Sequence, residues 1–78
     1  MKPAEYRQPC TITQETPYQI EPGELKGTHS STGVLQIGRV VWLQHNPEEH
    51  APEHRLSCYA EGIGIISVES RCLHPSSN

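Results

Sequence analysis

The stretch that decides the fold is VLQIGRVVWLQHNPEEHAPEHRLSCYAEGIGIISVESRCL, residues 34–73. It holds most of the Val, Ile and Leu residues of the 78-residue chain and its only Trp. Three runs within it have the composition and spacing of β-strands, and turn-forming residues separate them: VLQIGRVVWLQ, HRLSCYA and GIGIISVES. No part of the chain has a helical period of useful length. The sequence therefore predicts an all-β protein.

The end of this stretch indicates how the strands are arranged. GIGIISVESRCL, residues 62–73, resembles the close of Src-homology-3-like barrels: a glycine, a short apolar strand, a one-turn SerArgCys step and a final Leu. The resemblance is one of topology and identifies no particular family. Together with the short strands and small size, it implies a five-stranded Src-homology-3-like barrel or a rolled antiparallel sheet.

The remaining residues set the boundaries of a single domain. Residues 1–10 are mostly polar, contain two prolines and show no period, which predicts a flexible N-terminal arm. We expect one small β domain over residues 11–74 and a disordered tail over residues 75–78. At the start of the domain, TITQETPYQI predicts a strand that Pro17 interrupts or places at a sheet edge.

Alternation predicts which side chains face the core. Gly38 is expected to form a bulge or a bend within the first run. Ile65 and Ile66 are adjacent, so either one of them faces away from the core or a bulge at Gly64 changes the register. The residues expected to face inward from the first two runs are Leu35, Ile37, Val41, Leu43, Leu56, Cys58 and Ala60.

Charge and hydropathy argue against two classes of partner. The net charge is −3, and the six Lys and Arg residues stand singly rather than in the clusters that bind phosphate backbones. Nucleic acid is therefore an unlikely partner. The longest unbroken apolar run, Val40 to Leu43, is far shorter than a membrane span, and no secretory signal is recognisable. We expect a cytoplasmic protein that does not enter a membrane.

The cysteines are odd in number, which argues against a closed disulfide framework. Cys10, Cys58 and Cys72 are accordingly expected to be reduced thiols. Cys58 alternates with apolar residues, so it should behave as a small buried hydrophobe.

The sharpest local feature is a loop in which His and Glu alternate, residues 45–54. Imidazole and thiolate are good zinc ligands. The cluster over residues 45–58 therefore suggests a zinc site formed by His50, His54 and Cys58, with Cys72 or His74 as a possible fourth ligand. The alternative is a solvated, mildly acidic loop. Apart from zinc, the sequence predicts no cofactor.

A thin core leads to the main functional hypothesis. Only 33% of the residues are hydrophobic, and a small domain with so few of them often gains stability from a partner subunit. Val40, Trp42 and Ile65 have no obvious interior place in a single sheet, and Tyr59 should face outward. These four residues predict an interaction surface. The chain is thus expected to be a non-catalytic binding module that contacts itself or another protein.

A third hypothesis is an oligomeric barrel enzyme with its site on a symmetry axis. LQIGRVV and GIIS are similar to the strand pattern of plasmid-type dihydrofolate reductase, a tetramer of short chains. That family's Val-Gln-Ile-Tyr active-site stretch has no counterpart, because the comparable run here is IGII, so no functional residue carries over. The chain also lacks Asp, which removes the common Ser-His-Asp arrangement. In general type it resembles the small proteins encoded on mobile gene cassettes of bacteria.

Overall fold

The computed structural model describes residues 2–20 and 32–76, and within them the chain is all-β with no α-helix. Two short 3₁₀ turns, η1 and η2, punctuate the strands. The elements are β1 (Gln8–Ile12), β2 (Thr16–Ile20), β3 (Thr32–Leu35), β4 (Val40–Leu43), η1 (Pro47–Glu49), β5 (Arg55–Ala60), β6 (Gly64–Glu69), η2 (Ser70–Cys72) and β7 (Leu73–Pro75).

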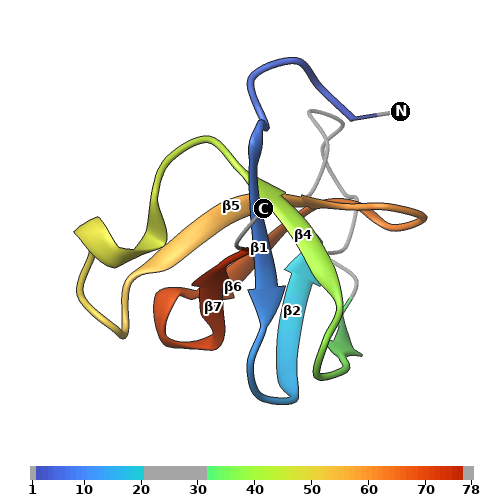
Figure 1. Ribbon diagram of the computed structural model, residues 1–78. Helices are drawn as coiled ribbons and strands as arrows, with labels where there is room; N and C mark the ends of the chain where they lie inside the picture. Colours follow the sequence, from blue (N-terminus) through green and yellow to red (C-terminus); the bar gives the residue numbers. More distant parts are fainter. Residues whose placement is uncertain (1, 21–31, 77–78) are drawn as a thin grey trace, which may run out of the picture.

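The seven strands of the described residues form one antiparallel sheet in the order β3-β2-β6-β5-β4-β1-β7. β3 and β7 do not pair, so the sheet is not closed into a barrel. Leu35 from one edge strand and Leu73 from the other nevertheless join the same core cluster, which requires the sheet to roll over on itself. Figure 1 shows this curvature, with β1 crossing β5 in the view. The predicted all-β antiparallel fold is confirmed, but the sheet has seven strands rather than five and is not closed into a barrel.

Two turns account for the additional strands. The expected strand over residues 11–20 is interrupted at the exposed residues 13–15, which leaves β1 and β2. Pro17 does not interrupt the strand but lies within β2, where it pairs with Val34 of β3. β2 pairs with β6 only at Gln19 and Ile20, so Pro17 has a strand neighbour on one side alone. A proline is tolerated in such a place because no second ladder needs its missing N–H.

Gly38 divides the run VLQIGRVVWLQ into β3 and β4. The backbone N–H of Arg39 donates to the carbonyl of Gln36 at 3.2 Å, and Gly38 has φ +92°. Residues other than glycine rarely adopt that backbone conformation. The predicted bend at Gly38 is therefore a tight turn. Ile37 lies in this turn and is 69% exposed, which corrects the prediction that it faces the core.

The N-terminal residues are more ordered than expected of a flexible arm. Gln8–Ile12 form β1, which lies between β4 and β7, and Tyr6 is buried. The predicted tail also begins late, because Pro75 belongs to β7 and the N–H of Ser76 donates to the carbonyl of Pro9 at 3.0 Å. Residues 21–31 and residues 77–78 of that tail lie outside the described residues.

One core holds the sheet together, and sulfur forms part of it. Cys10 and Cys58 are fully buried, and Cys72 is 3% exposed. All three are free thiols, as the sequence predicts. Burial raises the pKa of Cys10 to about 11 and that of Cys58 to about 12. The apolar residues packed with them are Ile12, Leu35, Val41, Leu43, Ala60, Ile66, Val68 and Leu73.

In the part of the chain that the structure describes, no helix has the length and hydropathy to cross a bilayer.

Candidate functional site

The histidine loop, residues 45–54, joins β4 to β5, and hydrogen bonds hold it at several points although most of its residues are exposed. Asn46 begins η1, because its side-chain Oδ1 accepts a hydrogen bond from the N–H of Glu48 at 2.9 Å. Pro47 occupies the first position of the 3₁₀ turn, where its missing N–H has no consequence, and it is buried. The loop thus has a defined conformation at its first end.

The turn η2 holds the loop from the other side. The hydroxyl of Ser70 donates to the carbonyl of Pro47 at 2.8 Å in a buried hydrogen bond. The N–H of Ser70 donates to the carbonyl of His54 at 2.8 Å, and that of Arg71 donates to Pro52 at 3.0 Å. These bonds anchor the loop to the sheet at three places.

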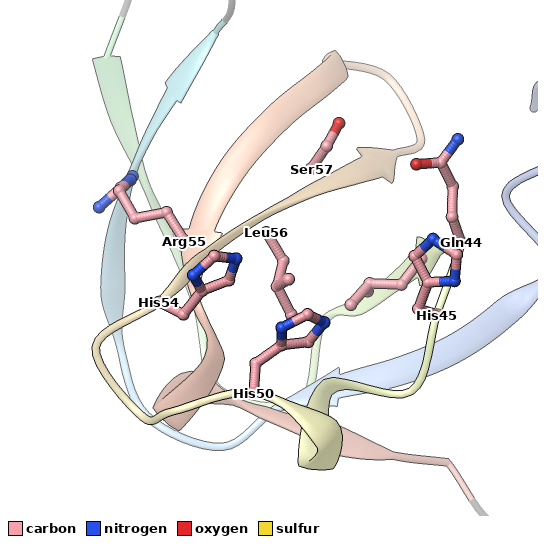
Figure 2. Close-up of a pocket in the computed structure, with 8 residues that line it drawn as sticks. Gln44, His45, His50, His54, Arg55, Leu56 and Ser57 are labelled. Carbon is pink, nitrogen blue, oxygen red and sulfur yellow. The ribbon is translucent and has the colours of Figure 1, made fainter.

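Between this loop and β5 lies a pocket of about 240 Å³. Leu43 and Leu56 supply its apolar lining, and His45, His50 and His54 supply imidazole rings. Figure 2 shows the rings of His50 and His54 around the Leu56 side chain, and His45 beside Gln44 at the opposite side of the view. The pocket therefore combines an apolar floor with a rim of groups that donate hydrogen bonds.

Two of the three predicted zinc ligands meet in this pocket, and the third does not. The rings of His50 and His54 are stacked, with centroids 4.7 Å apart and planes inclined by 7°. Nitrogen lone pairs lie in the ring plane, so parallel rings direct them side by side rather than toward one ion. Cys58 is fully buried in the core, and burial raises its pKa to about 12, which disfavours the thiolate that zinc requires. Among the described residues, no group of three or more His, Cys, Asp or Glu is placed to hold a metal ion.

Arg55 forms one margin of the pocket. Its Nε donates to the hydroxyl of Ser67 at 2.8 Å, and its Nη2 donates to the carbonyl of Ser67 at 2.7 Å. In Figure 2 the side chain points away from the imidazole rings. The position of this residue beside the pocket was not predictable from the sequence, because the pairing of β5 with β6 determines it.

The four residues predicted as an interaction surface do share one face of the sheet. Trp42 of β4 pairs with Tyr59 of β5, and Tyr59 pairs with Ile65 of β6. Val40 precedes Trp42 by two residues, so it lies on the same side. We call this side of β4, β5 and β6 the outer face. Val40 is 44% exposed, Trp42 and Ile65 are half-buried, and Tyr59 is buried.

The N-terminal segment explains why the outer face is partly covered. The ammonium group of Lys2 lies over the ring of Trp42, 3.7 Å from its centroid. The hydroxyl of Tyr6 shares a hydrogen bond of 2.9 Å with that of Ser57. Burial, followed by the charge of Glu61, raises the pKa of the Tyr59 phenol. Residues predicted to be a free arm therefore pack on the aromatic part of the predicted surface and leave Val40 open.

No family model, curated protein or solved structure matches this chain.

Proposed function

We propose that the chain is a small non-catalytic binding module that associates with a second copy of itself. One observation carries this proposal. Among the described residues, the exposed large hydrophobic side chains are Val34 at 53%, Ile37 at 69% and Val40 at 44%. All three fall within residues 34–40, at the end of β3, in the turn and at the start of β4. We call them the corner patch.

The concentration of these side chains is what calls for a partner. A single exposed apolar residue is ordinary, whereas here the exposed large hydrophobic side chains of the described residues all lie within one segment, residues 34–40. Burying one such side chain is worth about 1.5–3 kcal/mol. Ile37 has no structural need to be apolar, because its turn depends on Gly38. The corner patch also continues through Val40 to Trp42 on the outer face, so an interface centred here would include predicted surface residues.

The alternatives receive less support. A zinc protein would need a third ligand near His50 and His54, and Cys58 lies in the core instead. An oligomeric enzyme with a site on a symmetry axis would require the same self-association, so the experiment below is its first test as well. The relation to Src-homology-3-like barrels also stays a proposal. The order β6, η2 and β7 supports it, and the open sheet does not.

The test is the oligomeric state as a function of concentration. Light scattering after size-exclusion chromatography should give a mass above that of the monomer at micromolar concentrations. Ile37→Lys should weaken the association by about tenfold or more, because it places a charge in the apolar contact. Gln14→Lys, which adds the same charge at an exposed turn residue, should leave it unchanged. A monomer at every concentration up to high micromolar would refute the proposal.

A further inference from the structure

The pocket under the histidine loop is lined by side chains that donate hydrogen bonds and by no acidic side chain. Its polar lining includes three histidines, Gln44 and Arg55, and no carboxylate lines it. This composition is unexpected in a chain with nine acidic residues and a net charge of −3. The acidic neighbours within the loop, Glu48, Glu49 and Glu53, are exposed and stand outside the lining. The pocket is therefore locally less acidic than the rest of the molecule.

The basic groups of the pocket also lack protein counter-ions. In residues 2–20 and 32–76, one ion pair is formed, between Arg71 Nε and Glu69 Oε1 at 3.4 Å, and neither residue lines the pocket. Arg55 is held by a hydroxyl and a carbonyl of Ser67, which orient the guanidinium without neutralising it. Its side chain points away from the imidazole rings, so the polar groups left to contact an anion in the pocket are the three imidazoles and the amide of Gln44.

We propose that this pocket binds a small organic oxyanion, a carboxylate or phosphate carried on a compact apolar body. The oxyanion accepts hydrogen bonds from the imidazole and amide donors, and the apolar body covers Leu43 and Leu56. The stacked rings of His50 and His54 suit this role, because parallel rings that cannot converge on a metal can present N–H groups along one side. The proposal goes beyond self-association and uses no residue of the corner patch.

The volume sets the size of the ligand and its affinity. At about 240 Å³ the pocket is smaller than most drug-sized sites and accommodates a single aromatic ring with one charged substituent. For a ligand with so few atoms in an open pocket we expect a dissociation constant of about 0.1–1 mM, well short of the best affinities that ligands of this size can reach. Nuclear magnetic resonance titration measures affinities in this range and reports which residues respond.

The titration uses four probes in a buffer free of phosphate and carboxylate. Benzoate or phenyl phosphate should shift the resonances of His50, His54 and Leu56 and saturate, and the tighter of the two identifies the anion. Benzamide, the uncharged analogue of benzoate, and inorganic phosphate, which lacks the apolar body, should each bind about tenfold more weakly or not at all. Equal binding by benzamide would overturn the need for charge. Equal binding by inorganic phosphate would overturn the role of the apolar floor.

Variants locate the site. His50→Gln together with His54→Gln should weaken the better probe by about tenfold or more. His45→Gln tests the opposite wall separately and should also weaken it. His74→Gln is the matched control, because His74 is exposed on β7 and does not line the pocket. Unchanged affinity in the first two variants, or shifts confined to residues outside the pocket, would refute the proposal.

Discussion

At the scale of single residues, surroundings decide what a side chain contributes. Ile66 and Ile37 are identical in composition and opposite in environment. Ile66 is fully buried in β6, where it pairs with Cys58 on one side and Ile20 on the other. Ile37 is 69% exposed in a turn. The removal of one methyl group should therefore have different consequences at the two positions.

Ile66→Val should lower the free energy of unfolding by about 0.5–1.5 kcal/mol, because the lost methyl leaves a gap in the core. Ile37→Val should change it by less than about 0.5 kcal/mol, since the deleted group faces solvent. Urea denaturation at a protein concentration low enough to avoid association measures both. Equal losses at the two positions would contradict the burial described here.

The sequence predicted most of these residue environments correctly. Alternation placed Cys58 and Ala60 in the core, and of the two alternatives for the adjacent isoleucines the structure has the first, with Ile66 buried and Ile65 half-buried on the other face. Ile37 was misplaced because alternation was carried past Leu35, where β3 ends and the chain enters the turn at Gly38. A turn ends the alternation of inward and outward side chains that a strand has. The sequence does not show this, because apolar and polar residues continue to alternate through the turn.

At the scale of elements, η2 is the clearest example of a local structure with a distant role. The sequence predicted a one-turn step at Ser70–Cys72, and it is present. Its function as a clamp was not predictable, because the hydroxyl of Ser70 bonds the carbonyl of Pro47, 23 residues earlier in the chain. Such a contact depends on how β6 places the turn, and no local pattern records it.

Ser70→Ala should lower the free energy of unfolding by about 0.5–1.5 kcal/mol, because it removes one of two hydrogen bonds to the carbonyl of Pro47, which keeps the N–H of His50 at 3.2 Å. Ser76→Ala is the comparison. Its hydroxyl shares a 2.8 Å hydrogen bond with that of Thr11, but both groups are only partly buried, so water can replace the lost partner. Thermal unfolding of the two variants should therefore show a larger loss for Ser70→Ala. The clamp is excluded if the order is reversed.

At the scale of the whole molecule, the strand order and the position of the N-terminal segment could not be predicted from the sequence. Both depend on contacts between distant parts of the chain, such as β1 with β4 and β7. The histidine pocket illustrates the same limit. The loop was recognised from its composition, whereas Arg55, Leu43 and Leu56 join it only through strand pairing. The four outer-face residues share one side through the pairing of β4, β5 and β6, and their role as an interaction surface stays a prediction.

Removal of residues 1–6 should uncover Trp42, because Lys2 and Tyr6 are then absent from the outer face. Trp42 is the only tryptophan, so its fluorescence reports this change directly. We expect its emission to move to longer wavelength as water reaches the ring. A full-length Lys2→Gln variant should show a smaller shift, since Tyr6 remains in place. Unchanged emission in the truncated protein would show that the segment does not cover the ring in solution.

The sealed thiols of the core have a practical consequence. Cys10, Cys58 and Cys72 are all buried, and burial keeps the first two protonated at neutral pH. Maleimide reagents react with accessible thiolates, so they should not react with the three buried cysteines of the folded chain. A cysteine introduced at the exposed Ala51 would then react alone. Dyes or spin labels can thus be attached at chosen points while every natural cysteine is retained.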